Sequence, residues 1–381
     1  MKLKGISLFV IIALLSASAF AADIRLDTDD IEKWHSIYLG EYSENPIEWL
    51  VLDAKKNSMG TDGMFLITKN GLDTVPVSSV KYYPSSGLKN RCASLFDSFK
   101  ALEQKLVLPT NVRRINDFYL NDMFPIATEH AVENEPVFLM SAKEFNTYLK
   151  TSGHSRLDDA WYLRSNTEKW DGQMLISKYG DFNYTTGQYS FYFRPAMNIN
   201  PKNAAFLSPA EGGKESSTGL FPIEEKEDVT AWKLTLIDDK RTFSASSDSV
   251  AYSDDRTLTI NYTGIENEPN EYISAFLLDR EDTLISYGAL GRLLPESGSL
   301  SITLPDNLKN GEYTLQVFSE QRNGDKRSDY ISLPSVLSFT LTDRPSIPQT
   351  DDSQSPALWF GMLAASAFGI LAFIRKAKRV H

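Results

Sequence analysis

Two arginines set among aromatic residues form the pattern in this chain that best suits recognition chemistry. Arg164 follows Trp161-Tyr162-Leu163, and Arg194 follows Phe191-Tyr192-Phe193. Aromatic faces stack on sugars and peptide groups, and a guanidinium donates charge-assisted hydrogen bonds. The candidate ligand-binding residues are therefore Trp161, Arg164, Trp170, Tyr184, Tyr189 and Arg194. For the two arginines a structural role is the stronger interpretation, in which each bonds backbone carbonyls or a buried acid and ties strand ends together.

Patterns that would support catalysis or metal binding are sparse. None of the four histidines falls in a His-Glu-x-x-His pair, and the chain has no Gly-x-Ser-x-Gly elbow. The acidic runs Asp158-Asp159 and Asp27 to Asp30 lack the Gly and distal Glu of a calcium-binding loop, so we expect no metal and no cofactor. The enzymatic alternative is an envelope glycosidase whose carboxylate pair is drawn from Asp158, Asp159, Glu168 and Asp171.

Composition narrows the class of protein. With 42% hydrophobic residues the chain is globular. The net charge is -11, and no dense Lys/Arg block lies outside the termini, so nucleic acid is not an expected partner. A single cysteine, Cys92, excludes an internal disulfide and a cysteine-based zinc site.

The candidate residues lie in an expected α+β head domain over residues 22–203. Strands are predicted at Trp49–Leu52 and Met64–Thr68 and again at Trp161–Ser165 and Phe191–Met197. Between them, three- and four-residue spacing of apolar side chains predicts a helix over Cys92–Leu106, and Ser141 with Glu144 forms a capping box. We expect the first and last strands to pair.

A second domain is expected over residues 228–342, after a linker over residues 204–227 that is rich in Gly, Ser and Glu. Apolar and polar residues alternate in runs such as Leu258–Tyr262 and Tyr313–Phe318. Such runs, with turns about ten residues apart, predict an all-β immunoglobulin-like sandwich that acts as a spacer.

The two ends of the chain predict its location. Residues 1–21 have the form of a signal peptide, cleaved by signal peptidase before Ala22. A polar stalk at 343–356 precedes an uncharged apolar run at 357–374, predicted to be a single transmembrane helix, and a basic tail at 375–381 that stays cytoplasmic. We therefore expect a cell-surface, single-pass membrane protein with an external amino terminus.

The stalk contains Ile347, Pro348, Gln349, Thr350 and Asp351. With the apolar run and basic tail behind it, this stretch resembles the Leu-Pro-x-Thr-Gly sorting signal of Gram-positive surface proteins, which sortase cleaves after the Thr. Pro348 and Thr350 match that signal, but Asp351 stands where Gly is expected. Both attachment to the cell wall and simple retention in the membrane remain open.

The head and the sandwich each resemble a bacterial module. Trp49–Leu52, Leu66–Asp73, Val137–Ser141, Trp161–Ser165 and Phe193–Ala196 resemble the motifs of domain of unknown function 6273. The Phe-Arg-Pro-Ala ending is also similar to the close of formylglycine-generating-enzyme-like and C-type-lectin-like folds, which implies a lectin-like scaffold. Asn270–Ala275, Ser286–Gly288 and Leu308–Tyr330 resemble a membrane-proximal module of Firmicutes surface proteins.

Together these patterns predict a non-enzymatic surface protein of a Gram-positive envelope. Its head would bind a carbohydrate or protein ligand, and its sandwich would lift the head from the membrane. The alternatives are the envelope hydrolase described above and a purely structural surface protein.

Overall fold

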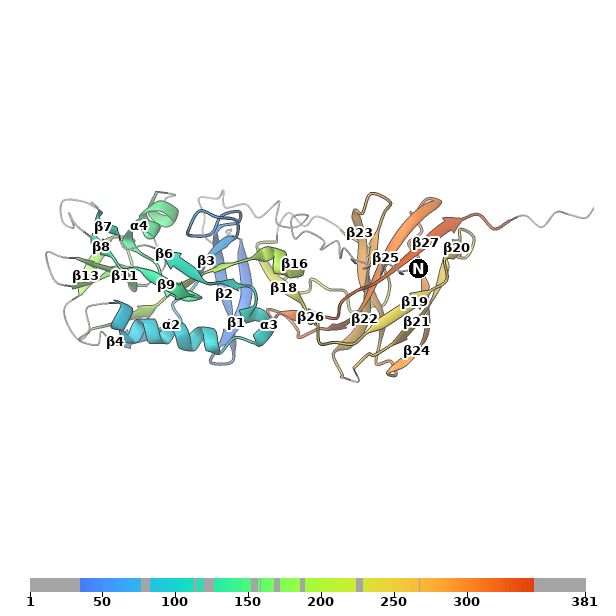
Figure 1. Cartoon of the computed structure of the whole chain (residues 1–381), viewed down its shortest axis with the longest axis horizontal. Helices are drawn as coiled ribbons and strands as arrows, with labels where there is room; N and C mark the ends of the chain where they lie inside the picture. The colour runs from blue at the N-terminus through green and yellow to red at the C-terminus, as the bar shows by residue number, and fades with distance from the viewer. Residues whose placement is uncertain are drawn as a thin grey trace, which may run out of the picture.

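A computed structural model describes residues 35–76, 83–112, 115–118, 127–151, 157, 159–167, 172–185, 189–223, 229–266 and 268–345. The described chain is elongated, with the head at one end and the sandwich at the other (Figure 1). The predicted signal peptide, sorting motif, transmembrane helix and basic tail lie outside the described residues. Within the described part of the chain, no helix has the length and apolar character needed to cross a bilayer.

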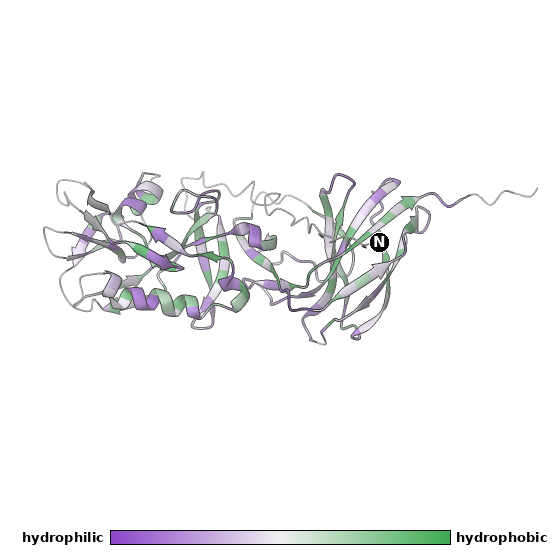
Figure 2. Cartoon of the chain, viewed as in Figure 1, coloured by the Kyte–Doolittle hydropathy of each residue, from purple (hydrophilic) through white to green (hydrophobic). Residues whose placement is uncertain are grey.

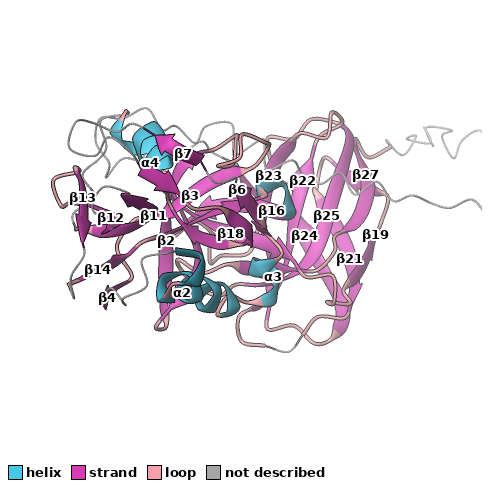
Figure 3. Ribbon diagram, turned by 60° about the vertical axis from the view of Figure 1, so that its left-hand side comes forward, coloured by secondary structure: helices cyan, strands magenta, loops and turns pink. Residues whose placement is uncertain are grey.

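The head contains most of the strands expected from its sequence and several that were not. Its strands are β1 (Ser36–Tyr42), β2 (Asn45–Asp53), β3 (Met64–Thr68), β4 (Asp73–Pro76), β5 (Val107–Leu108), β6 (Thr110–Val112), β7 (Ile115–Phe118), β8 (Ala127–Glu129), β9 (Val132–Glu135), β10 (Val137–Leu139), β11 (Trp161–Thr167), β12 (Gly172–Ile176), β13 (Phe182–Thr185), β14 (Ser190–Phe193), β15 (Pro195–Ile199) and β16 (Ala204–Pro209). Its helices are η2 (Tyr83–Ser85), α2 (Gly87–Asp97), α3 (Ala101–Gln104), α4 (Ala142–Phe145), η3 (Asn146–Lys150) and η4 (Pro201–Asn203). Strands thus dominate, and in the described chain every helical turn precedes residue 204 (Figure 3).

A central sheet is the middle layer of the head and is buried on both faces. Successive side chains of β2 alternate between the faces, so Trp49 and Val51 enter one core and Leu50 and Leu52 the other. Helix α2 covers the first face through residues such as Leu95, whereas α4, η3, β11 and β12 cover the second. This double burial explains why the strands read as nearly continuous apolar runs. The predicted pairing of the first and last strands is confirmed, because β15 pairs with β3.

The helical segment of the head differs from its prediction in one respect. The single helix expected over Cys92–Leu106 is instead two helices, α2 and α3. Helix α2 ends where the Ser98 hydroxyl donates to the Leu95 carbonyl at 2.6 Å, and α3 begins where the Lys100 N–H donates to Glu103 at 3.1 Å. The break turns Phe99 into the core, edge-on to Trp49 with 6.4 Å between ring centroids. At the other predicted helix start, Ser141 and Glu144 form the expected capping box.

The second part of the chain is a two-sheet sandwich, as its alternating pattern predicted. Its strands are β17 (Phe221–Pro222), β18 (Ala231–Ile237), β19 (Ser244–Ser247), β20 (Val250–Tyr252), β21 (Thr257–Thr263), β22 (Glu271–Leu278), β23 (Leu284–Arg292), β24 (Ser297–Thr303), β25 (Gly311–Gln321), β26 (Asp329–Ile331) and β27 (Ser335–Thr342). The small sheet β19-β21-β24 packs on a larger one containing β23, β22, β25 and β27. Figure 2 shows both hydrophobic and hydrophilic residues along these strands, and inward residues such as Ile260, Ile273 and Val317 fill one core.

Head and sandwich share a single 15-stranded sheet. Strand β1 pairs antiparallel with β2 in the head and parallel with β18, which in turn pairs parallel with β26 of the sandwich. We call this junction of head and sandwich the seam. Side chains reinforce it: Ser328 donates to Glu103 at 2.8 Å, and Arg327 lies 2.8 Å from Glu41. The expected boundary near residue 228 is therefore not a break in the sheet.

The prediction of a linker over residues 204–227 is wrong for the described residues of that segment, which include two strands. Residues 204–209 form β16, which pairs antiparallel with β18, and Phe221 and Pro222 form β17, which pairs with β23. Phe206 and Leu207 are buried. The polar composition of residues 211–217 suggested a solvated linker, but the segment runs across the seam, and the side chain of Lys214 is 5% exposed.

Gly40 offers a test of how tightly β1 is held at this seam. It has φ +71°, and a Cβ there would lie 2.3 Å from the ring of Phe99. We expect Gly40→Ala to lower the free energy of unfolding by about 2–4 kcal/mol, since left-handed strain and overpacking add. Gly60→Ala is the control, because Gly60 has φ +77° and no atom within 4 Å of its Cβ position; it should lose only about 1 kcal/mol. Urea unfolding measures both, and equal losses would mean that Phe99 moves aside without cost.

Candidate functional site

The two arginines predicted to contact a ligand lie inside the head. Arg164, on β11, donates to the carbonyls of Leu139 at 2.7 Å and His130 at 3.2 Å and to Glu144 Oε1 at 2.9 Å. Arg194, between β14 and β15, donates to the carbonyls of Thr68 at 3.2 Å and Lys69 at 2.7 Å. Their exposed fractions are 0% and 1%. The structural interpretation of both arginines is therefore correct, and their assignment as ligand-binding residues is wrong.

The other predicted binding residues that the structure describes differ in their burial. Trp161 is fully buried, with the Arg194 guanidinium 5.7 Å from its ring centroid, so its assignment to a ligand is also wrong. Tyr184 packs partly buried against the core, whereas Tyr189 is 69% exposed. Trp170 lies outside the described residues. Burial is the physical reason for the correction, because a side chain closed off by the core has no face left for a ligand.

Most of the acidic residues proposed for catalysis or calcium binding lie outside the described residues. Asp158, Glu168, Asp171 and the run Asp27 to Asp30 lie outside the described residues, and Asp159 is partly buried. Among the residues that the structure describes, no group of three His, Cys, Asp or Glu side chains is placed to hold a metal ion.

The Arg164–Glu144 pair ties β11 to the amino-terminal end of α4. Glu144 also accepts the Ser141 N–H at 2.8 Å, so one carboxylate caps the helix and pairs with the guanidinium. Two buried opposite charges with several hydrogen bonds hold each other in place. Removing one of them leaves the other buried without a partner charge.

We therefore expect Arg164→Ala to lower the free energy of unfolding by about 3–5 kcal/mol, because Glu144 would stay buried and unpaired. The measurement is chemical denaturation followed by circular dichroism. The control is Arg344→Ala, which removes an exposed pair with Asp254 and should leave the unfolding midpoint unchanged. Similar midpoints for the two variants would contradict a structural role for Arg164.

A surface cleft of about 540 Å³ lies beside the seam between head and sandwich. The β1–β2 hairpin, the segment between β3 and β4, and the connection between β25 and β26 form its walls. The lining residues are Tyr38, Tyr42, Ser43, Asn45, Pro46, Ile47, Glu48, Asn70, Gly71, Leu72 and Lys326. The lining thus combines phenols, amides, one carboxylate and one ammonium with a few apolar side chains.

The charged groups of the cleft are held in defined positions. Glu48 accepts from Ser36 at 2.7 Å and from Lys69 at 2.9 Å. The Lys326 ammonium lies 2.6 Å from Glu211 and 5.8 Å from the centroid of the Tyr38 ring. Burial and then the charge of Glu48 raise the pKa of Tyr38, so its phenol stays neutral at ordinary pH. Such fixed donors and acceptors suit binding of a polar ligand.

Sequence reasoning missed this cleft because its walls come from distant parts of the chain. Tyr38 and Tyr42 lie on β1, a strand that was not predicted, and Lys326 comes from the sandwich. The spacing of two tyrosines four residues apart in Tyr38-Leu39-Gly40-Glu41-Tyr42 was the available signal.

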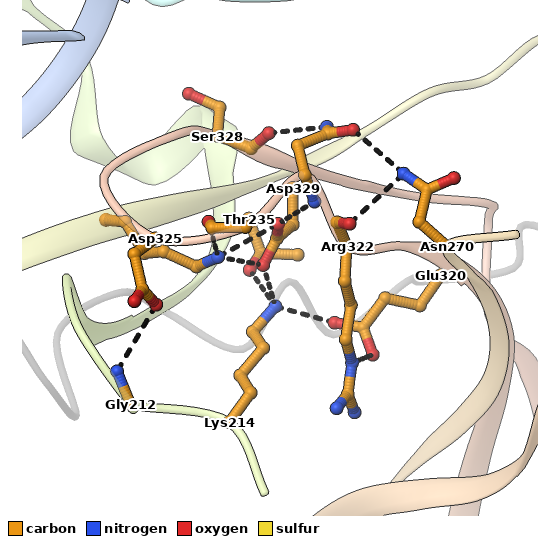
Figure 4. A network of polar contacts seen from close by, with 12 residues as sticks. Gly212, Lys214, Thr235, Asn270, Glu320, Arg322, Asp325, Ser328 and Asp329 are labelled. Carbon is orange, nitrogen blue, oxygen red and sulfur yellow. Dashed lines mark hydrogen bonds and ion pairs between the residues drawn. The ribbon is translucent and has the colours of Figure 1, made fainter. Parts of the chain in front are cut away.

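A buried network of charges lies where the segment after β16 crosses the sandwich sheet (Figure 4). The Lys214 ammonium is 2.6 Å from Glu320 Oε1, 2.6 Å from Asp329 Oδ2 and 2.8 Å from the Thr235 hydroxyl. Lys233 lies 2.8 Å from Asp329 Oδ2. The side chains of Glu320 and Asp329 are 0% exposed.

Further donors complete the network around Glu320. Arg322 Nε lies 3.0 Å from Glu320, and the Tyr287 hydroxyl donates to it at 2.8 Å. Burial alone would raise the pKa of Glu320, but the charges of Lys214 and Arg322 and the hydrogen bonds from Lys214 and Ser274 outweigh it and lower the pKa to about 2. At neutral pH Glu320 is therefore a carboxylate.

Comparison with known proteins does not place the chain in a family. No known protein family and no curated protein matches it. CopC from Methylosinus trichosporium OB3b, a solved structure, is 20% identical over 27% of this chain and 93% of that chain, with a TM-score of 0.19. The BSP domain of a biofilm associated protein is 10% identical over 67% of this chain and 55% of that chain, also with a TM-score of 0.19. At these scores neither likeness bears on the fold or the function.

The lowered pKa of Glu320 predicts loss of stability in acid. The pKa of Glu320 is about 2 in the folded chain and 4.5 at its ordinary value. Ionised Glu320 therefore stabilises the folded state fully above pH 4.5, and this stabilisation is lost as the pH falls toward 2. The loss is on the order of 3 kcal/mol. Urea unfolding between pH 7 and pH 2 should show a shallower acid dependence for Glu320→Gln than for the natural chain. Asp239→Asn, which alters an exposed acid, is the control and should follow the natural chain; identical profiles for all three would contradict the prediction.

Proposed function

We propose that this chain is a surface-displayed binding protein, in which the head and the cleft beside it take up a carbohydrate or protein ligand and the sandwich is the spacer. The observation that carries the proposal is the cleft of about 540 Å³ with its tyrosines, amides and fixed charges. Binding, and not catalysis, is the chemistry that suits it, since Glu48 is held by Ser36 and Lys69 and Lys326 by Glu211.

Ligand contacts in this proposal come from two kinds of side chain, amides and a phenol. Asn45 is exposed and stands at the start of β2, and Asn70 is exposed in the segment after β3, so both amides face solvent at the rim. Tyr42 is half-buried; its hydroxyl already donates to Asp73 at 3.3 Å, so it offers the face of its ring. Amides and phenols hydrogen-bond sugar hydroxyls or peptide groups, and a tyrosine face stacks on the apolar side of a sugar ring.

The spacer role is supported by the sheet that runs through both parts of the molecule. A continuous hydrogen-bonded sheet resists bending at the seam more than a flexible linker would, so the head would be held at a fixed angle and distance. The proposal includes a lectin-like scaffold for the head and an immunoglobulin-like one for the sandwich. It also includes an external amino terminus and anchorage by the apolar run at residues 357–374, with wall attachment or membrane retention at the Ile347–Asp351 motif.

The sheet also favours a second candidate, a purely structural surface protein. Its rigidity would serve that role without any ligand. The hydrolase alternative rests on Asp158, Asp159, Glu168 and Asp171, of which only Asp159 lies among the described residues.

The test is binding of the purified full chain, in detergent, to an array of glycans and peptidoglycan fragments. We expect saturable binding that weakens about tenfold or more in the double variant Asn45→Ala/Asn70→Ala, because two hydrogen bonds contribute about 1–3 kcal/mol together. The control is Tyr179→Ala, which removes a tyrosine that is 63% exposed in the turn between β12 and β13. It should bind as the natural chain does.

Two other outcomes would contradict parts of the proposal. Binding that is unchanged in the double variant would move the site away from the cleft. If the array and a pull-down from intact cells both give no partner, the binding proposal fails and the structural role stands.

A further inference from the structure

The small sheet of the sandwich ends at a strand with an open side. In the order β19-β21-β24, strand β24 lies at the edge, and no described strand pairs with its far side. We propose that two copies of this chain associate through this edge, with β24 against β24, and form one antiparallel sheet across a two-fold axis. This association goes beyond the proposed binding role and does not depend on it.

β24 differs from the other edge strands of the sandwich. β17, β20 and β19 are short, with 2, 3 and 4 residues, whereas β24 has 7. Proteins protect a free edge by keeping it short, by a bulge, or by a charge or proline on it. Strand β24, Ser297–Thr303, has no charged residue and no proline, and its pairing with β21 has no register shift. The edge thus has none of the usual protection against a second strand.

The bonds between β24 and β21 show which backbone groups face the open side. At one end of the pairing, the Gly264 N–H donates to the Glu296 carbonyl at 2.9 Å. At the other end, the Leu304 N–H donates to the Arg256 carbonyl at 2.8 Å. Bonded and unbonded pairs alternate in an antiparallel ladder, so the even-numbered residues of β24 bond to β21 and the odd-numbered residues face away. The N–H and C=O groups on the open side are therefore those of Ser297, Ser299, Ser301 and Thr303.

A register centred on Leu300 satisfies all of these groups at once. The two-fold axis then places Ser299 of each copy opposite Ser301 of the other, and Ser297 opposite Thr303. Each such pair exchanges two hydrogen bonds, which gives about eight bonds between the chains. Leu300 meets Leu300 at the axis as an unbonded pair, in which the side chains lie closest.

The side chains on both faces of β24 suit this pairing. Leu300 is partly buried against the sandwich core, and the second Leu300 would cover its open side. The net charge of -11 makes copies of the chain repel each other, but β24 itself is uncharged. The register also places Glu296 opposite Leu304 and not opposite another acid. A second copy is therefore the occupant that the charge pattern favours.

Pairing through β24 would change how the chain binds. A closed two-fold contact uses both edges, so association stops at the dimer. The dimer presents two heads and two clefts, and a ligand repeated along a polymer or surface would be held at both.

The test is the protein mass of the purified full chain in detergent, measured by light scattering during size-exclusion chromatography. At about 100 μM the natural chain should have the mass of two chains, given a dissociation constant of about 10 μM. In Ser299→Lys/Ser301→Lys, like charges face each other in two pairs, so the dissociation constant should rise about tenfold or more. In Ser299→Lys/Ser301→Glu each lysine faces a glutamate of the other copy, and the dimer should persist.

The matched control is Thr259→Lys/Asn261→Lys, which places two lysines on β21 opposite Ser301 and Ser299 of the same chain. It should dimerise as the natural chain does, and circular dichroism should show that each variant is folded. A monomeric natural chain would overturn the proposal and leave the edge to another protein or to a segment of this chain outside the described residues. Dimers that survive in the double-lysine variant would overturn it by moving the contact elsewhere. Loss of the dimer in both charged β24 variants would overturn the two-fold register.

Discussion

The parallel pairing of β1 with β18 is the interaction on which the rest of the structure depends. Ser36, Ile37 and Tyr38 stand opposite Ala231, Trp232 and Lys233, so the first described strand of the head lies against a strand of the sandwich. The polar edges that two separate sheets would expose are thereby satisfied by each other, and one sheet runs through the molecule. The cleft lies beside this pairing, which brings Lys326 of the sandwich to a cleft otherwise lined by the head, and the buried charge network lies next to it.

Buried charge recurs where segments distant in sequence must be held together. In the head, Arg164 and Glu144 join β11 to the start of α4, and at the seam Lys214 joins the segment after β16 to Glu320 and Asp329. In each case a long side chain reaches across a layer to satisfy carbonyl or carboxylate oxygens that water cannot reach. Burying such charges costs desolvation free energy, and removing one partner of a pair costs more still. These contacts therefore fix one arrangement of the layers more than they add stability.

The same chemistry explains why the predicted binding site failed. An arginine among aromatic residues has the same local sequence whether it faces a ligand or a core, because both settings offer aromatic faces and oxygen acceptors. What distinguishes Arg164 and Arg194 from surface arginines is that distant parts of the chain bring carbonyls, and for Arg164 also the Glu144 carboxylate, around them. The residues that line the cleft carry weaker sequence signals, since Tyr42, Asn45 and Lys326 are ordinary on their own and become a site only when the hairpin and the sandwich loop meet.

The sequence by itself determined the features that depend on near neighbours. Apolar runs predicted β2 and β3, and alternation predicted β21, β22 and β25. The Ser141–Glu144 pair predicted the start of α4. These signals are local, because the pattern of a strand and the cap of a helix are set within a few residues. Only the tertiary structure decided that β1 joins β18, that residues 204–209 form a strand and that Lys214 is buried. Those outcomes rest on partners up to about two hundred residues away in the chain, and the free energy of such contacts leaves no periodic trace in the local sequence.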